Sequence, residues 1–249
     1  MTASHSETPG SDARGFSFAL VEGDGGLQLV ARHHPRYAPL ILDWTGAAIR
    51  RRIGAGRGQL LGRAIGLHKM SAPRVLDATA GLGRDGFTLA ALGAEVTLVE
   101  RQPLLAALLR DALASLHGDP AWADVAGRLR LVEAEARQVL RSGERWDVVH
   151  LDPMYPHRGK DALPQKEMQI LRELCGADAD AHGLLAPALA ACRQRVVVKR
   201  PLHAEFLDGR APAFQLRGKQ ARYDVYVPAT AAEGQTTDRA QPSDPPCAC

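Results

Sequence analysis

The sequence contains little cysteine, and its cysteines do not form a recognisable framework. Four cysteines occur among 249 residues. Cys175 and Cys192 lie in apolar, helix-like stretches, where cysteine acts as a small buried hydrophobe. Cys247 and Cys249 form a Cys-x-Cys pair in a proline-rich tail, which is too short for a metal site that normally needs four ligands. We therefore expect neither a disulfide scaffold nor a bound metal.

The sequence also lacks a hydrophobic segment of membrane-spanning length. No apolar run approaches the roughly 18 residues that a transmembrane helix needs. The opening residues, MTASHSETPGSDARG, lack the apolar core of a secretory signal. Hydrophobic residues make up 45% of the chain and charged residues 24%, which is typical of soluble globular proteins. The sequence therefore predicts a cytoplasmic protein with no membrane partner.

Local composition divides the chain into four parts. Residues 1–14 and 229–249 are rich in small and polar residues and are expected to be disordered tails. Residues 15–72 begin with an alternating pattern around a Gly-Asp-Gly-Gly turn and continue into basic helical stretches, which predicts a small N-terminal subdomain with a β-hairpin at 16–32. Short apolar runs alternate with helical segments from 73 to 228, as in a parallel sheet covered by helices on both faces.

Positive charge is concentrated in one segment. The formal net charge of the chain is only +3, but seven Lys or Arg residues and no acidic residue lie between Arg50 and Arg74. Such a segment is either a solvated helix face or a surface that binds phosphates. In the second case, the candidate RNA-binding residues of this segment are Arg51, Arg52 and Arg57.

A glycine-rich loop follows the first strand of the predicted sheet. The stretch DATAGLGRDGF contains Gly81-x-Gly83-x-x-Gly86, and the second strand ends in Glu100. Glycines let a backbone approach a ligand closely, and an acid at the second strand's end accepts hydrogen bonds from ribose hydroxyls. This combination favours a nucleotide-like cofactor over a tight turn with a helix cap.

The acids near this loop separate two candidate cofactors. A dinucleotide such as NAD places its pyrophosphate at the helix N-terminus, where Asp85 would repel it. S-adenosylmethionine (SAM) has no phosphate and carries a cationic sulfonium and an ammonium. Asp77 and Asp85 therefore favour SAM.

The stretch LDPMYPHRGK follows the fourth strand of the predicted sheet, where ligands of such sheets bind. The Asp152 carboxylate and the Pro153 carbonyl offer two acceptors to one exocyclic NH2 group, and the Tyr155 ring is placed to stack on a base. Holding both N–H bonds orients the nitrogen lone pair of a weakly nucleophilic aromatic amine. The alternative is an ordinary Asp-Pro turn. We favour a catalytic clamp for a planar amine.

Further basic residues lie near the same edge. Lys199 and Arg200 end the fifth strand, and the charges after the clamp are His157, Arg158 and Lys160. All five are expected at the rim of the active site, either as contacts to a nucleic-acid backbone or as ordinary solvated charges. His150, inside an apolar run, is expected to be a satisfied core or interface histidine rather than a catalyst.

Three stretches together resemble a known family. VLDATAGLGRDGFTLAALGAEVTLVERQPLLAALLRDAL, HLDPMYPHRGKDALPQKEM and VVVKRP are similar to the RsmJ family of bacterial small-subunit ribosomal RNA guanine-N2 methyltransferases. The likeness extends over roughly residues 15–228. It implies a Rossmann-like class I SAM-dependent fold, with a seven-stranded, mostly parallel sheet and a small N-terminal α+β subdomain. At matching positions it implies cofactor contacts from Arg84, Asp85, Glu100, Arg101, Glu135, Ala136 and Asp152.

The leading hypothesis is methyl transfer from SAM to guanine N2 of 16S ribosomal RNA, as naked RNA or in the 30S subunit. Because the clamp suits any planar NH2, DNA adenine and a protein glutamine amide remain alternatives. The glycine pattern alone also permits an NAD-dependent dehydrogenase, and the basic segment alone permits a non-catalytic RNA-binding module.

Overall fold

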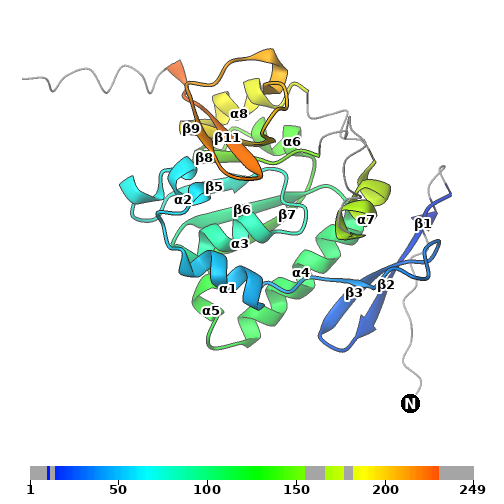
Figure 1. The fold of residues 1–249 in the computed structure, drawn as a ribbon. Coiled ribbons are helices and arrows are strands. Elements are labelled where there is room, and N and C mark those ends of the chain that lie inside the picture. The colour runs from blue at the N-terminus through cyan, green and yellow to red at the C-terminus, as the bar shows by residue number, and fades with distance from the viewer. Residues whose placement is uncertain (1–9, 12–14, 155–165, 177–181, 230–249) are drawn as a thin grey trace, which may run out of the picture.

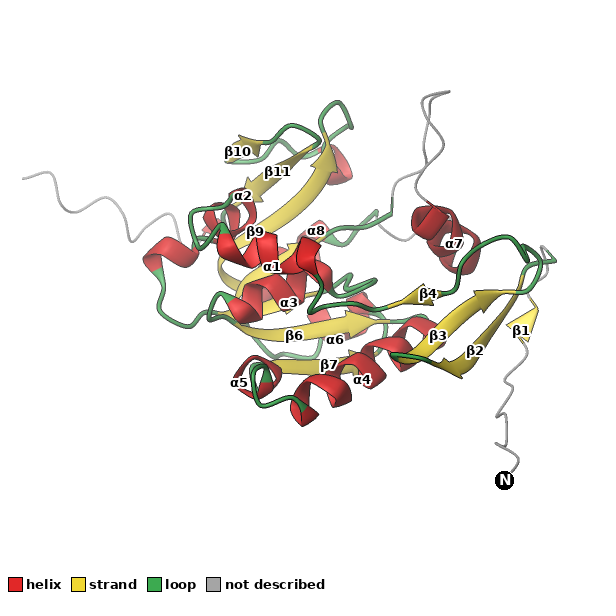
Figure 2. Ribbon diagram, turned by 60° about the horizontal axis from the view of Figure 1, so that its bottom comes forward, coloured by secondary structure: helices red, strands yellow, loops and turns green. Residues whose placement is uncertain are grey.

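The computed structural model describes residues 10–11, 15–154, 166–176 and 182–229. Its centre is a seven-stranded sheet with the order β10-β11-β9-β8-β5-β6-β7 (Figures 1 and 2). The strands are β5 (Arg74–Asp77), β6 (Glu95–Glu100), β7 (Leu129–Glu133), β8 (Trp146–Leu151), β9 (Cys192–Pro201), β10 (Phe214–Arg217) and β11 (Ala221–Tyr226). Strands β5 to β9 pair in parallel, whereas β11 is antiparallel to both β9 and β10. The expected seven-stranded, mostly parallel fold is confirmed.

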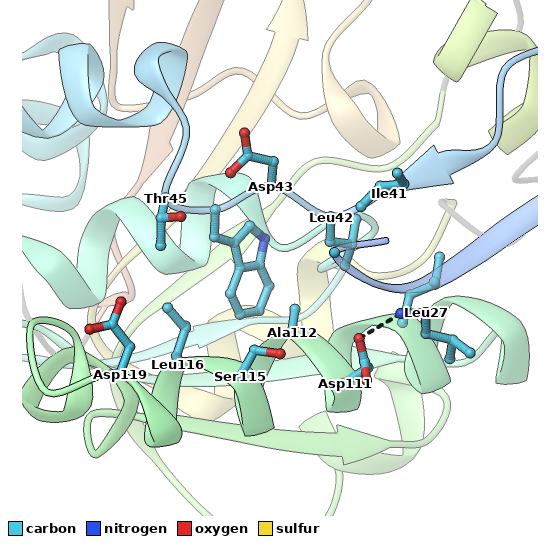
Figure 3. A pocket seen from close by; sticks show the side chains of 13 residues that line it. Leu27, Ile41, Leu42, Asp43, Thr45, Asp111, Ala112, Ser115, Leu116 and Asp119 are labelled. Atoms are coloured by element: carbon cyan, nitrogen blue, oxygen red, sulfur yellow. Dashed lines mark hydrogen bonds between the residues drawn. The ribbon is translucent and has the colours of Figure 1, made fainter. Parts of the chain in front are cut away.

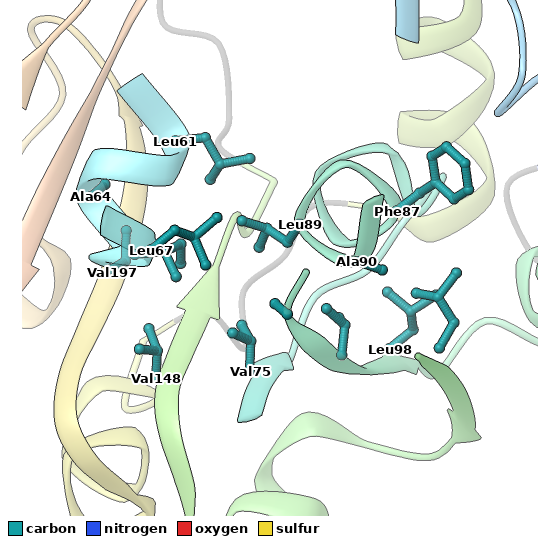
Figure 4. Close-up of a cluster of buried hydrophobic side chains, with 14 of the residues drawn as sticks. Leu61, Ala64, Leu67, Val75, Phe87, Leu89, Ala90, Leu98, Val148 and Val197 are labelled. Carbon is teal, nitrogen blue, oxygen red and sulfur yellow. The ribbon is translucent and has the colours of Figure 1, made fainter. Parts of the chain in front are cut away.

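Helices cover both faces of this sheet because successive strand residues point to opposite sides. Val75, Val148 and Val197 face one cluster of buried side chains, shown in part in Figure 4, and the neighbouring Leu76 and Val198 face another. The first face is covered by α1 (Ala47–Gly54), α2 (Leu60–Ile65), α3 (Arg84–Ala91), α4 (Pro103–Gly118) and α5 (Ala123–Ala126). The second face is covered by α6 (Ala136–Leu140) and α8 (Leu185–Ala191). Among the described helices, none is long and apolar enough to cross a membrane.

The N-terminal hairpin is confirmed as part of a small antiparallel sheet, whose strands are β1 (Gly10–Ser11), β2 (Ser17–Gly23), β3 (Gly26–Ala31) and β4 (Leu40–Ile41). Its turn has Gly25 at φ 97° and Gly26 at φ 109°, which is why the sequence needs glycine there. The sheet packs on α4 and on α7 (Lys166–Cys175) through a third cluster of buried side chains. Strand β1 lies inside the stretch 1–14, where its two residues pair with β2.

The segment after this sheet belongs to the main core rather than to the small sheet. Trp44 is 3% exposed, stacks on Phe87 with ring centroids 5.3 Å apart, and donates from its indole N–H to the Leu82 carbonyl at 2.8 Å. Buried residues of α2, including Ile65, join the same core as β5 and α3. Residues 15–72 therefore pack in two places, and the Trp44 contact anchors their second half directly to the glycine loop.

Candidate functional site

Parallel pairing brings the carboxyl ends of β5, β6, β8 and β9 to one edge of the sheet. The connections there are joined by hydrogen bonds. The Ala78 N–H donates to the His150 carbonyl at 3.0 Å, and the Asp152 N–H donates to Thr79 Oγ1 at 2.6 Å. The glycine loop and the Asp-Pro stretch are thus held side by side. Thr79 was not identified from the sequence as a site residue, although it lies within the stretch DATAGLGRDGF.

The glycine loop needs its glycines for different reasons. Gly81 and Gly83 adopt φ values of 55° and 68°, which residues with a Cβ rarely take. A Cβ on Gly83 would lie 2.5 Å from the Trp44 ring, whereas a Cβ on Gly81 would meet nothing within 4 Å. Gly83 therefore serves close packing, and Gly81 leaves open space above the loop.

Glu100 lies at the end of β6 and faces this loop. Its Oε2 accepts the backbone N–H of Gly81 at 2.9 Å, and its Oε1 accepts that of Gln102 at 2.8 Å. The residue is 8% exposed, and burial raises the pKa of its carboxyl above the ordinary value, against the lowering effect of these hydrogen bonds. Each carboxylate oxygen retains a second lone pair, so the group is equipped to accept hydroxyl donors from a ribose.

The other predicted cofactor residues lie around the same edge. Arg84 at the start of α3 pairs with Glu167 of α7 at 2.9 Å. Arg101 pairs with Glu135 at 3.6 Å across the ends of β6 and β7, and Ala136 begins α6. The structure thus brings Arg101 and Glu135 together. Direct contact of any of these residues with SAM remains a prediction.

A cluster of opposite charges fills the space between the glycine loop and the exits of β8 and β9. Lys199 Nζ lies 2.7 Å from Asp152 Oδ2 and 3.0 Å from Asp85 Oδ2. Arg52 of α1 donates to the other oxygen of Asp85. His150 also contacts two of the carboxylates: its Nδ1 lies 3.2 Å from Asp77 Oδ1, and its Nε2 lies 4.0 Å from Asp85 Oδ2. Three carboxylates and three basic side chains therefore meet here.

The charges in this cluster set each other's protonation. Burial opposes ionisation of Asp85, but Lys199, His150 and Arg52 together hold the pKa of its carboxyl well below the ordinary range. Burial raises the pKa of Asp152, with Lys199 acting against this and Asp85 reinforcing it. The two carboxylates outweigh burial at Lys199 and raise the pKa of its ammonium, so the lysine is charged at neutral pH.

His150 is not the fully satisfied core histidine that the sequence led us to expect. Its ring is fully buried, and its Nε2 has no hydrogen-bond partner within the described part of the chain. Asp77, followed by Asp85 and Asp152, outweighs burial and raises the pKa of the imidazole.

The predicted RNA-binding residues are placed in different environments. Arg51 is exposed on α1, whereas Arg52 turns inward to Asp85. Arg57 donates to the backbone carbonyls of Leu92, Met70 and Ser71. Its role is therefore structural, because it joins the segment between α1 and α2 to the end of α3 and to the residues before β5.

Lys199 and Arg200, at the end of β9, do not lie at the rim of the site as expected. Lys199 points into the charge cluster rather than to the rim. Arg200 is 5% exposed and donates to the Glu205 carbonyl on the other face of the sheet. Adjacent strand residues point to opposite faces, so both side chains cannot serve the same surface.

Part of the predicted clamp lies outside the described residues. Asp152 and Pro153 are described, and Pro153 is buried immediately after β8. Tyr155, His157, Arg158 and Lys160 fall in the stretch 155–165, for which the structure gives no account. Stacking by Tyr155 and phosphate contacts by the three basic residues remain predictions.

Two further features lie apart from this edge. His33, His34 and Glu173 form a group whose potential ligand atoms lie within 4.8 Å of one another, while His33 Nε2 contacts the Glu173 carboxylate directly at 2.8 Å. Figure 3 shows a pocket of about 340 Å³ between α4 and the segment before α1, with Trp44, Asp111 and Asp119 in its lining. Neither feature shares a residue with the charge cluster.

Comparison with known proteins agrees with this geometry. Residues 11–228 match the model of a family described as "Putative SAM-dependent methyltransferase". The ribosomal RNA small subunit methyltransferase J of Pseudomonas paraeruginosa strain DSM 24068 / PA7 is 50% identical over 213 residues, covering 84% of this chain and 82% of that protein. The protein of the same name from Shewanella loihica is 49% identical over 219 residues, covering 85% and 83%.

A solved structure gives the same result for the fold. The crystal structure of a SAM-dependent methyltransferase from Neisseria gonorrhoeae superposes with a TM-score of 0.65 and 33% identity, covering 84% of this chain and 82% of that chain. The expected class I fold and the expected SAM dependence are therefore confirmed. The chain belongs to the family of SAM-dependent methyltransferases that includes ribosomal RNA small subunit methyltransferase J.

Proposed function

We propose that the protein transfers a methyl group from SAM to the exocyclic N2 amine of a guanine in 16S ribosomal RNA. The observation that carries this proposal is the position of Asp152, which leaves β8 beside the glycine loop in a chain half identical to proteins named ribosomal RNA small subunit methyltransferase J. An enzyme with this substrate acts in the cytoplasm, where small subunits are assembled.

The residues at the sheet edge fit SAM. Open space lies over Gly81, and the Glu100 carboxylate faces that loop with lone pairs available for ribose hydroxyls. Asp77, Asp85 and Asp152 place carboxylate oxygens at this edge, each beside a basic side chain of the charge cluster. When bound, SAM supplies an activated methyl group on its sulfonium. We assign its binding to Gly81, Gly83, Glu100 and the neighbouring side chains of Arg84, Asp85, Arg101, Glu135, Ala136 and Asp152.

The chain's own contribution to the reaction is to orient the amine and stabilise its developing charge. An exocyclic guanine nitrogen is a poor nucleophile because its lone pair is delocalised into the ring. Asp152 and the Pro153 carbonyl accept the two N–H bonds, which directs the lone pair toward the methyl carbon. The Asp152 carboxylate would stabilise the positive charge that develops on this nitrogen during the transfer. The nitrogen then loses a proton to Asp152 or to water.

The RNA has to present an unstacked base to this edge. Exposed basic side chains of the segment 50–74, namely Arg50, Arg51, Arg63, His68 and Lys69, are suited to contact phosphates. Stacking of the extruded guanine on Tyr155 would offset the energy of removing it from its neighbours. The proposed partner is accordingly 16S RNA, either alone or within the 30S subunit.

The proposal is tested by incubating the full chain with labelled SAM and undermodified 16S RNA or 30S subunits, followed by nucleoside mass spectrometry. The expected product is N2-methylguanosine, and Asp152→Ala should abolish it while leaving RNA binding intact. The proposal fails if the folded wild-type protein labels neither RNA substrate, or if the label appears instead in DNA adenine or a protein glutamine.

A further inference from the structure

One ammonium group connects two carboxylates at the centre of the site. Lys199 leaves β9 on the face covered by α1 and α3, because it pairs in the sheet with Tyr223, a member of the core on that face. Its Nζ lies 3.0 Å from Asp85 and 2.7 Å from Asp152. Its side chain is 29% exposed, the Asp85 side chain 9% and the Asp152 side chain 38%. The lysine is therefore held between one buried and one partly exposed carboxylate.

Resting on the function proposed above, we infer that Lys199 is a positioning residue for methyl transfer, which holds the Asp152 carboxylate with one oxygen turned toward the substrate amine. No covalent step passes through Lys199. Its action is exerted on Asp152, and Asp152 is the group that touches the amine.

The backbone N–H of Asp152 and one of its carboxylate oxygens have different partners. Its backbone N–H is held by Thr79 Oγ1 at 2.6 Å, and its Oδ2 is held by Lys199. Among the described residues no hydrogen-bond donor reaches Oδ1, and this is the oxygen that we assign to an N–H bond of the substrate. With the main chain and one oxygen fixed, rotation of the carboxyl group is restricted. A rotamer restricted in this way is what an orienting acceptor requires.

Asp85 gives Lys199 its own fixed position. The other oxygen of Asp85 is bound by Arg52, so the order of contacts is Arg52, Asp85, Lys199, Asp152. Arg52 comes from α1, Asp85 from α3, Lys199 from β9 and Asp152 from the exit of β8. An exposed ion pair contributes little because both side chains are mobile and solvated. This row is different because four separate elements hold it and its central carboxylate is buried.

The charges around Asp152 indicate what the positive charge of Lys199 contributes. The groups that face Asp152 are Lys199 from β9, Asp85 from α3 and His150 from β8, with Arg52 and Tyr223 next to Asp85 and Lys199. Burial and the Asp85 charge both favour protonation of Asp152, whereas Lys199 and, to a smaller extent, His150 oppose it. A protonated carboxyl would lose acceptor capacity and its attraction for positive charge on the nitrogen. Removing Lys199 should therefore move Asp152 toward the neutral form.

The test compares the wild-type protein with Lys199→Met and Lys199→Arg. Methionine keeps much of the packing volume without the charge, and arginine restores a charge with different geometry. SAM affinity is measured by calorimetry, so that kcat can be compared at saturating SAM, and RNA affinity by filter binding, which is expected to stay within about threefold. The kcat of Lys199→Met is expected to fall about 100-fold, the loss that a misplaced reacting group typically causes, with partial recovery in Lys199→Arg. The acid limb of its pH profile should move to higher pH.

A second readout does not depend on methyl transfer. Carboxyl 13C NMR, with Asp152→Asn for assignment, follows the titration of Asp152 in the wild type and in folded Lys199→Met or Lys199→Gln. We expect the midpoint to rise when the ammonium is removed. The inference is overturned if that midpoint stays unchanged, or if the wild type methylates RNA and Lys199→Met retains its kcat and pH profile. Failure of the wild type to methylate RNA would instead refute the proposed function and leave the NMR result to decide the role of Lys199.

Discussion

The Glu100 carboxylate accepts the backbone N–H of Gly81 at 2.9 Å, so the end of β6 directly holds the glycine loop. Its other oxygen accepts the N–H of Gln102 at 2.8 Å. Both oxygens therefore face backbone donors. The loop should therefore be disturbed even by Glu100→Gln, which keeps the size of the side chain and replaces one oxygen with an NH2 group.

We predict that Glu100→Gln weakens SAM binding about 10-fold to 100-fold, corresponding to the roughly 1.5–3 kcal/mol of a hydrogen bond to a charged group. The amide NH2 has to face one of the two backbone N–H donors, whichever way the side chain is turned. Isothermal titration calorimetry measures the change. Glu95→Gln is the matched control, because Glu95 is exposed at the start of the same strand. Equal SAM affinity in wild type and Glu100→Gln would refute the assignment of Glu100.

We also predict that SAM binding weakens on acidification from a pH above the ordinary glutamate pKa of 4.5. Burial raises the pKa of Glu100 above that value, so protonation begins at a higher pH than for an exposed glutamate. The protonated carboxyl accepts hydroxyl donors less well, and binding of the carboxylate form must therefore fall as the pH drops through the raised pKa. Calorimetry over the pH range in which circular dichroism shows a folded protein checks this. A pH dependence identical in Glu100→Gln would assign the effect to another group.

Gly83 and Gly81 offer a matched test of loop packing. Both have positive φ, so alanine costs backbone strain of about 1–2 kcal/mol at either position. At Gly83 the added Cβ also meets the Trp44 ring and Leu109, at 2.5 and 2.8 Å, which adds an overpacking cost of about 1–3 kcal/mol. Gly83→Ala should therefore lower the Tm clearly more than Gly81→Ala does. Equal Tm values in thermal melts would contradict the close contact between Trp44 and the loop.

The basic segment should separate into residues that bind RNA and residues that stabilise the fold. Arg51 is exposed, so Arg51→Ala should reduce RNA affinity and lower the slope of log K against log salt by about one, with little change in Tm. Arg57 donates to three backbone carbonyls, so Arg57→Ala should lower the Tm. Salt-dependent binding and thermal melts measured on both variants check the distinction. Loss of RNA affinity confined to Arg57→Ala would reverse it.

The elements that were predictable from sequence are those with a local signal. Continuous apolar strands between helices gave the parallel sheet, and Gly-Asp-Gly-Gly located the hairpin turn at Gly25 and Gly26. The glycine loop, Glu100 and Asp152 were found because each lies at or just after the end of a strand. Parallel pairing then places such strand ends at one edge.

The residues that were misplaced or missed depend on contacts between distant parts of the chain. Lys199 meets Asp85 across 114 positions, and the indole of Trp44 meets Leu82 across 38. Nothing local distinguishes such side chains from solvated ones. The alternation of strand residues did contain one unused signal, since Lys199 and Arg200 had to face opposite sides of the sheet. Strand β1 escaped prediction because two residues carry no periodicity.

The central claim concerns one nucleotide of 16S RNA, and the most direct measurement is nucleoside-resolved mass spectrometry of that RNA after deletion of the gene. We predict that one guanosine loses its N2-methyl group, and that the wild-type gene restores it while an Asp152→Ala gene does not. Unchanged N2-methylation of every 16S guanosine in the deletion strain would contradict the proposed function.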